Sequence, residues 1–408
     1  GNDDNTGAAL IAGEVRTEIG DMVESAVISM KEDNIMTSTD GAFAFSNNPV
    51  GYNYSINAEK SDDHLNGVST LDLVLIQKHI LGLESLNSPY KVIAADINND
   101  ENVSAIDLVQ LRKLILGIYD ELPNNDSWRF SDANATFDDA NDPFPFTESI
   151  DVDFLTENRM NEDFIAIKIG DVSGNAIANS LIAGGRNNAS ITLTAQDAQV
   201  SAGQSVRVAI TSDEFEGINA LQFTMGLSGL KYTAIESGAL EMNDDNVAIF
   251  EGRMTAAWYN VDAVNTDETL FTLVFTALEN TTLSNAISIG SEITKAEAYN
   301  SNNEGADVAL AFETGEGLVN GATFELFQNQ PNPFDNITTI GFQLAEVGAA
   351  KMTVFDVTGK IVTTVQGQYT RGYNEITLSK NDLDASGVLY YQLESGEFTA
   401  TRKMILID

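Results

Sequence analysis

The chain opens with short segments in which apolar and polar residues alternate. Between residues 8 and 60 the runs IAGEVRTEIG, ESAVISM, GAFAFSN and GYNYSINAEK alternate with a period of two, and Gly, Asn and Asp separate them. Such alternation is typical of strands that bury one face, and the separating residues favour turns. The first sixty residues therefore predict a small β-sandwich.

Two later segments have the period of a helix. The runs LVLIQKHILG (73–82) and LVQLRKLILG (108–117) both end in ILG, and an aspartate precedes each, Asp72 and Asp107. Apolar residues at this spacing predict amphipathic helices. We expect two copies of one loop-plus-helix unit here. The acidic stretch 122–180, which contains scattered aromatics, is expected to extend that helical module.

Strand patterns return in the second half of the chain. Residues 190–313 contain many short alternating runs, which favour a sandwich or barrel. The expected fold class is mostly β, with tandem sandwich domains and one small α-helical, EF-hand-like module. The expected domains are 8–60, 61–180, 190–313 and 322–408, with joints at 179–189 and around Gly315–Gly321.

Oxygen-bearing side chains recur through the run DINNDENVSAID (96–107). They fall at the ligand positions of a twelve-residue EF-hand-type loop, which binds calcium through carboxylate, amide and backbone oxygens. The candidate ligands are Asp96, Asn98, Asp100, Asn102 through its backbone oxygen, Ser104 and Asp107. Position six is Glu101, where such loops prefer glycine. The alternative is a solvated acidic turn with Asp107 capping the following helix.

The equivalent loop before the first helix is degraded. Alignment of Asp72 with Asp107 puts Ser61, Asp63, Leu65, Gly67 and Ser69 at the ligand positions. Leu65 has no side-chain oxygen, so a site here depends on Asp63 or Asp62, backbone oxygens and Asp72. Asp171, in the string GDVSGN, resembles the opening of a further loop and is a candidate to lend a carboxylate.

The amino-acid composition limits the kinds of partner and reactive site that the chain can have. The 21 Lys+Arg stand against 61 Asp+Glu, giving a formal charge of −40, and the chain has no cysteine and two histidines. A strongly negative field repels phosphate backbones and attracts divalent cations. We therefore expect no nucleic acid partner, no thiolate chemistry and little material for His-dependent catalysis. No apolar run is long enough for a membrane-spanning segment.

The two loop-plus-helix repeats ending in ILG resemble a type I dockerin, a calcium-folded module that inserts into cohesin domains. That resemblance implies bound Ca²⁺ and a partner of cohesin/dockerin type. It also places recognition residues on the helices: Gln77 and Lys78 on the first, Arg112 and Lys113 on the second, with Leu71 and Ile106 at the helix starts. A solvated helix face is the alternative for these residues.

Three further resemblances cover the rest of the chain. The order of strands and turns in 8–60 resembles carboxypeptidase-regulatory-like sandwiches, and GQSVRV followed by GINALQF resembles the opening strands of cohesin. The QNQPNPF opening, the turn Asp356–Lys360 and the terminal KMIL resemble the type A C-terminal sorting domain of the type IX secretion system of Bacteroidetes. These resemblances imply a secreted protein on the outer surface of a Gram-negative bacterium, handled by that secretion machinery.

Taken together, these features predict a calcium-binding, non-enzymatic surface protein that acts in adhesion or extracellular assembly. Because plug-like and socket-like modules occur on one chain, other copies of the chain are candidate partners, and a head-to-tail contact would build a filament. Docking of the two modules within one chain is the competing arrangement. Two different functions compete with assembly: a carbohydrate-binding adhesin that uses Trp258 and Tyr259, and the C-terminal targeting part of a larger secreted hydrolase.

Overall fold

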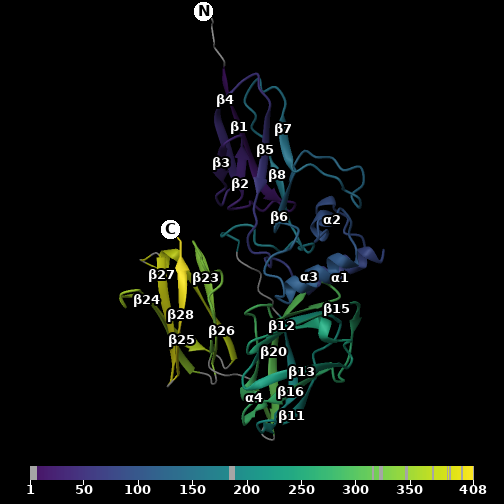
Figure 1. Cartoon of the computed structure of the whole chain (residues 1–408), viewed down its shortest axis with the longest axis vertical. Coiled ribbons are helices and arrows are strands. Elements are labelled where there is room, and N and C mark those ends of the chain that lie inside the picture. Colours follow the sequence, from purple (N-terminus) through teal and green to yellow (C-terminus); the bar gives the residue numbers. More distant parts are fainter. Residues whose placement is uncertain are drawn as a thin grey trace, which may run out of the picture. The chain divides into compact units, whose positions relative to one another are not determined.

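Figure 1 shows the computed structural model of the chain, which describes residues 7–182, 189–314, 317–320, 325–344, 348–369, 372–383, 385, 387–396 and 398–407. The chain divides into two compact units, Gly1–Arg186 and Asn187–Asp408. Strands dominate both, and helices longer than one turn occur in a single region among the described residues, so the expected fold class is confirmed. Within the described ranges, no helix is long and apolar enough to cross a bilayer.

The first unit contains a sandwich of two four-stranded sheets. One has the order β4 (Ala42–Pro49), β1 (Ala8–Thr17), β8 (Phe164–Lys168), β6 (Trp128–Asp132), and the other β3 (Asp33–Met36), β2 (Val27–Met30), β5 (Tyr54–Glu59), β7 (Ser149–Val152). Strand β1 pairs antiparallel with β4 and parallel with β8. The alternating pattern of β4 turns Phe43 and Phe45 into the core, where their rings meet edge to face.

Three helices lie between β5 and β6 in the sequence: α1 (Thr70–Ile80), α2 (Pro89–Ala95) and α3 (Ala105–Ile115). The division therefore differs from the one expected at residue 60, because strands drawn from 122–180 complete the first sandwich instead of extending the helical module. Phe130, Ile150 and Phe164 share one core with Ile11 and Phe43. The helical module is an insertion into the sandwich.

The second unit begins with a sandwich of unequal sheets. The larger sheet has the order β14 (Val247–Phe250), β15 (Arg253–Val264), β12 (Ile218–Leu227), β19 (Glu297–Asn300), β20 (Gly305–Thr314), β21 (Gly317–Asn320), with β18 (Ile287–Gly290) on β12 and β9 (Ala189–Gln196) parallel to β20. The smaller has the order β11 (Ser205–Ile210), β16 (Phe271–Ala277), β13 (Leu230–Ser237). Short elements complete it: β10 (Gln199–Val200), β17 (Thr281–Thr282), α4 (Leu283–Ala286) and the 3-10 helix η1 (Asp244–Asn246).

A third sandwich ends the chain. Its sheets have the orders β22 (Glu325–Leu326), β23 (Ile337–Leu344), β26 (Gly372–Ser379) and β25 (Ile361–Tyr369), β24 (Gly348–Asp356), β27 (Gly387–Ser395), β28 (Phe398–Leu406), and the 3-10 helix η2 spans Lys380–Asp382. Its core is separate from that of the preceding sandwich. The buried Tyr391 hydroxyl donates to the Phe327 carbonyl oxygen at 2.7 Å, which ties the opening of this segment to β27.

The two expected joints fall partly outside the described residues. Residues 183–188, Gly315, Glu316 and Gly321 are not described, whereas β21 lies inside the second expected joint and pairs with β20. Trp258, a candidate for sugar stacking, is only 3% exposed and packs against Phe215. Burial removes the flat exposed face that sugar stacking needs.

Candidate metal-binding and docking site

Helices α1 and α3 begin in the same way. Ser69 and Ser104 are N-cap residues whose hydroxyl oxygens accept the backbone N–H two residues on, at 3.3 Å in both helices. In return Asp72 and Asp107 accept the backbone N–H groups of those serines at 2.9 and 2.8 Å. Such a capping box satisfies donors that a helix start leaves unpaired. The repeated sequence thus builds two helices with matching acidic first turns.

Asp96 and Asp107 lie buried at the two ends of loop 96–107. The two carboxylate oxygens of Asp96 accept the backbone N–H groups of loop positions five and six, each at 3.0 Å. Oδ1 of Asp107 accepts those of positions two and three at 2.9 and 3.2 Å. The loop therefore closes around its first and last carboxylates, as a twelve-residue calcium loop must.

The other candidate ligands follow between these ends. Asn98 Nδ2 donates to Asp100 Oδ2 at 2.7 Å, Asp100 Oδ1 accepts the Asn102 N–H at 3.0 Å, and the Ser104 hydroxyl donates to Asp107 at 3.2 Å. Calcium takes six to eight oxygen ligands of this mixed kind. The described residues hold no group of three or more His, Cys, Asp or Glu arranged to hold a metal ion, so amide, hydroxyl and backbone oxygens are needed here too.

Burial raises the pKa of both Asp96 and Asp107 above the ordinary range of a carboxyl group. Low dielectric surroundings disfavour the charged form, and a nearby cation favours it. A bound divalent cation would therefore offset a cost that the fold imposes on these two carboxylates. The donor set and its charge fit calcium.

Two residues outside the predicted loop hold it in place. Arg129 Nη1, from β6, donates to Asn99 Oδ1 at 2.8 Å, and Asn125 Nδ2 donates to the Asp96 carbonyl oxygen at 2.9 Å. Sequence reasoning missed both, because neither sits in the repeat and nothing local marks their contact with it. The loop is consequently fixed to the sandwich as well as to α3.

The two carboxylates predicted for the degraded first loop differ in burial. Asp63 is exposed in a turn with φ of 34°, whereas Asp72 is buried at the start of α1. Oδ1 of Asp72 accepts the backbone N–H groups of Val172 and Ser173 at 3.0 and 2.9 Å, so the structure sets Asp72 beside the Asp171 segment.

The predicted partner-binding residues fall into different environments. Ile106 is 56% exposed on α3, whereas Leu71, at the equivalent place on α1, is 4% exposed. Lys78 pairs with Glu84 at 3.2 Å, and the Lys113 ammonium lies 5.5 Å from the centre of the Tyr119 ring. Gln77 and Arg112 are half-buried. Ile106, with exposed Val109 one turn on, gives α3 an apolar surface that α1 does not match.

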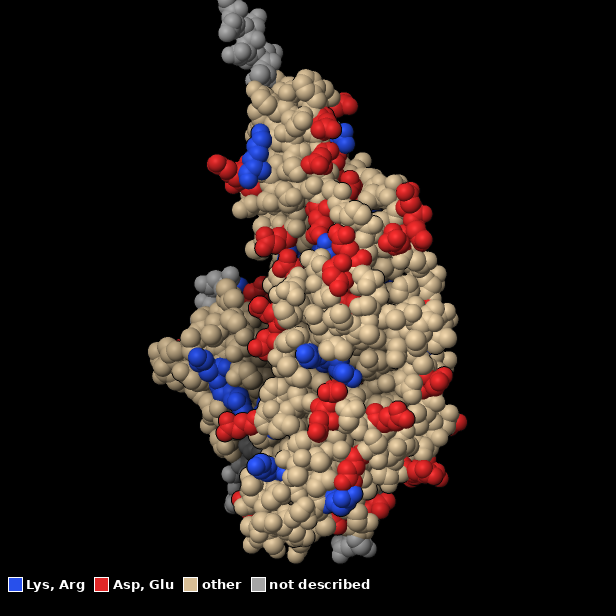
Figure 2. Space-filling view, turned by 45° about the vertical axis from the view of Figure 1, so that its right-hand side comes forward, with Lys and Arg blue, Asp and Glu red and all other residues tan. Residues whose placement is uncertain are grey.

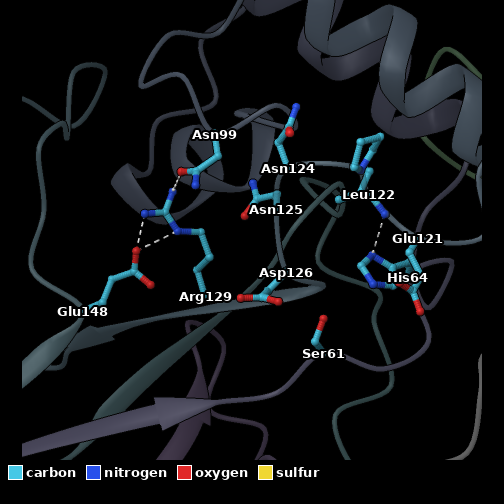
Figure 3. A pocket seen from close by; sticks show the side chains of 11 residues that line it. Ser61, His64, Asn99, Glu121, Leu122, Asn124, Asn125, Asp126, Arg129 and Glu148 are labelled. Atoms are coloured by element: carbon cyan, nitrogen blue, oxygen red, sulfur yellow. Dashed lines mark hydrogen bonds and ion pairs between the residues drawn. The ribbon is translucent and has the colours of Figure 1, made fainter.

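A polar pocket of about 380 Å³ lies beside loop 96–107, as Figure 3 shows. Ser61, His64 and Asp126 line it, which are the residue types of a catalytic triad. His64 Nδ1, however, accepts the backbone N–H of Leu122 at 3.3 Å, and the described contacts include no hydrogen bond from His64 to Ser61 or Asp126. The described contacts therefore do not link these three side chains as a Ser–His–Asp triad would.

Comparisons with known proteins match two parts of the chain to families. Residues 66–116 match the dockerin type I domain, and residues 330–407 match the secretion system C-terminal sorting domain. The expected dockerin and sorting modules are thereby confirmed, and both are non-catalytic modules. The sorting domain marks a secreted or cell-surface protein of Bacteroidetes. No curated protein is similar enough in sequence to be matched to the chain.

Solved cohesin structures are similar to part of the chain. A type I cohesin–dockerin complex from Clostridium thermocellum has 12% identity, covers 30% of this chain and 94% of its own, and gives a TM-score of 0.25. The sixth cohesin of scaffoldin B from Acetivibrio cellulolyticus, in complex with a Cel5 dockerin mutant, has 16% identity with coverages of 30% and 94% and a TM-score of 0.26. A non-cellulosomal cohesin from Archaeoglobus fulgidus has 16% identity, coverages of 30% and 86%, and a TM-score of 0.24.

Proposed function

We propose that this secreted protein works by calcium-dependent docking, with loop 96–107 as a calcium site and the exposed start of α3 as the docking surface. The observation that carries the proposal is the pair of buried carboxylates, Asp96 and Asp107, closed around one loop at the foot of that helix. Calcium would supply positive charge at the centre of the loop. The residues themselves fix the backbone that starts α3 and so orient Ile106 and Val109 outward.

The partner we propose is the 190–313 sandwich of a second copy of this chain. Residues 190–313 contain 4 Lys+Arg and 18 Asp+Glu, a formal charge of 4 − 18 = −14, whereas α3 carries Arg112 and Lys113 near its end. Complementary charge steers association, and an apolar centre such as Ile106 gives the contact its affinity. Figure 2 shows how far acidic side chains outnumber basic ones on the visible surface.

A contact between different surfaces of successive copies does not close on itself, so it propagates. Negative-stain microscopy and sedimentation of the full chain in millimolar calcium should show filaments or a ladder of oligomers, lost on chelation. The substitution Ile106→Asp should abolish them. Met36→Asp, which changes an apolar residue on β3 that is at least as exposed, should not. Monomers alone at high concentration with calcium present would contradict the proposal.

An adhesin that binds carbohydrate is less well supported. Its candidate aromatic, Trp258, is buried in the sandwich core. Catalysis within the chain is also disfavoured, since the pocket that brings Ser61 and His64 together leaves His64 occupied by a backbone N–H. We therefore propose binding and assembly, without catalysis, as the role of these modules.

A further inference from the structure

Two segments about a hundred residues apart in sequence meet beside α1. The first, Gly67–Asp72, leads into that helix. The second, Asp171–Ala176, follows the end of β8. Together they repeat the backbone hydrogen bonds that the first and last carboxylates of loop 96–107 accept, and Asp171 accepts two more, from the Gly174 N–H at 2.7 Å and the Ser173 hydroxyl at 3.0 Å.

The aspartates in the first turns of α1 and α3, Asp72 and Asp107, make equivalent hydrogen bonds. In loop 96–107, Oδ1 of Asp107 accepts the N–H groups of positions two and three, and its Oδ2 accepts the N–H of the N-cap residue Ser104. Asp72 does the same: its Oδ1 accepts the N–H groups of Val172 and Ser173, and its Oδ2 accepts that of Ser69 at 2.9 Å. Val172 and Ser173 therefore stand at positions two and three, although they are far from Asp72 in sequence.

The aspartates at position one are equivalent as well. Asp96 accepts the N–H groups of positions five and six. Asp171 accepts those of Asn175 at 3.3 Å and Ala176 at 2.8 Å, the fifth and sixth residues counted from Asp171. Position four has positive φ in both places, 59° at Asn99 and 81° at Gly174. The backbone of 171–175 thus follows the first five positions of the contiguous loop, whereas position six differs, since Glu101 has φ of 63° and Ala176 is not in the positive-φ region.

The two segments pack closely at the crossing point, where Asn66 and Gly67 of the first contact Ala176 and Ile177 of the second. Asn66 Oδ1 accepts the Ile177 N–H at 2.9 Å, and its Nδ2 donates to the Ile177 carbonyl oxygen at 2.8 Å. A Cβ added to Gly67 would lie 2.6 Å from the Ala176 Cα, so only glycine allows this approach. The break in the chain therefore falls between positions six and seven.

Charge and family similarity both indicate a cation here. Asp72 and Asp171 are both buried, with exposed fractions of 0% and 8%, and buried carboxylates are stabilised by a counter-charge. The buried Lys168 ammonium is a positive charge close to these carboxylates. Its described hydrogen bonds, however, go to the carbonyl oxygens of His64 and Ile169, at 2.9 and 3.2 Å, and not to Asp72 or Asp171. Independently, the match to the dockerin type I domain begins at residue 66, the start of the second half-loop.

We propose that these two segments form a second, split calcium loop. Its ligands are the side chains of Asp171, Ser173, Asn175, Ser69 and Asp72, with the Gly67 carbonyl oxygen at position seven. The inference rests on the calcium-binding part of the proposed function. A metal held there joins the residues after sandwich strand β8 to the start of α1, so it fastens the start of the helical insertion to the sandwich.

The test is calcium stoichiometry of the full chain, measured by titration calorimetry and native mass spectrometry. The wild type should bind two ions at the module. Asp171→Asn should keep only the ion of loop 96–107, and Asp96→Asn should keep only the ion of the split loop. Asp63→Asn is the matched control, because Asp63 belongs to the contiguous alternative (61–72) and not to the split loop. It should still bind two ions. Circular dichroism checks that each variant is folded.

Gain of affinity gives a second readout if Asp171→Asn unfolds the protein. Asn175→Asp places a carboxylate at position five, as Asp100 does in the other loop, and should tighten one of the two sites roughly three- to tenfold. An unchanged affinity would overturn the split loop. So would loss of an ion in Asp63→Asn but not in Asp171→Asn.

The two proposals fail in different ways. One ion in the wild type, lost in Asp96→Asn and kept in Asp171→Asn, would overturn the split loop and leave the proposed function standing. No bound calcium at all would overturn both.

Discussion

The two proposed calcium loops share the backbone hydrogen bonds of their first and last carboxylates but differ in chain connection. Loop 96–107 is continuous, so its carboxylates are held together by twelve residues and the helix they start. The split loop joins Asp72 to a segment a hundred residues away, across the whole insertion and three sandwich strands. Its closure therefore depends on the folded sandwich, whereas the contiguous loop closes locally at a small entropic cost. A metal site is defined by where its oxygens lie, not by the continuity of its chain.

Removal of calcium should have the largest effect and should separate the two units. A site held at a hundred times its dissociation constant stabilises the folded state by about 2.7 kcal/mol, so two sites give roughly 5 kcal/mol. In a unit of this size that corresponds to a fall of roughly 10–20 °C in melting temperature. Calorimetry of the full chain should show this fall for the unit ending at Arg186 only. An equal fall in the unit from Asn187 onward would mean that the acidic surface in general senses the metal.

A side chain at the crossing point should damage only the split loop. Gly67→Ala combines positive φ with a contact of 2.6 Å to backbone, and should lower the free energy of unfolding by about 2–3 kcal/mol. Gly82→Ala is the matched control: it has a similar φ of 67° but open space around the new Cβ, and should lose only about 1 kcal/mol. Urea unfolding measures both. Equal losses would argue against a tight crossing.

The two helix caps allow a symmetric comparison. Ser69→Ala and Ser104→Ala each remove one N-cap hydroxyl and one proposed ligand position, and each should destabilise the first unit by about 1 kcal/mol. In calcium the loss should grow in both variants, because each also weakens one ion. Urea unfolding with and without calcium tests this. A calcium-dependent loss in Ser104→Ala alone would leave the contiguous loop as the one metal site.

Relief of backbone strain should give the smallest effect, of opposite sign. Glu101 holds φ of 63° at position six, where a glycine has no steric penalty. Glu101→Gly should therefore raise the free energy of unfolding by up to about 1 kcal/mol. Thermal unfolding at saturating calcium measures it, and a clear loss of stability would show that the Glu101 side chain contributes more than its backbone strain costs.

The sequence predicted what is local. The oxygen spacing of 96–107 and the helical period after it depend on neighbours in the chain, and both appear in the structure with helix starts at Thr70 and Ala105. The expectation that residues 122–180 extend the helical module was wrong, because strands from this stretch pair with distant ones: Val15 pairs with Phe164, about 150 positions away. No local pattern encodes such a pairing.

The same limit applied to the candidate site. Asp171 was recognised as a loop opening, but a contiguous alignment paired Asp72 with Asp63. Hydrogen bonds from Val172 and Ser173 to Asp72 supply the missing half of the pattern. They form only when β8 is paired within the sandwich, which places the residues after it beside α1. The burial of Trp258 was likewise invisible, since an aromatic in an alternating strand fits either face of a sheet.

The most direct test is anomalous diffraction from crystals of the full chain grown with calcium. The account predicts a strong peak among the oxygens of Asp96, Asp100 and Asp107, at roughly 2.3–2.6 Å from its ligands, and a second peak between Asp72 and Asp171. Absence of the second peak alone would remove the split loop. Absence of the first, with calcium in the crystal, would contradict the account as a whole.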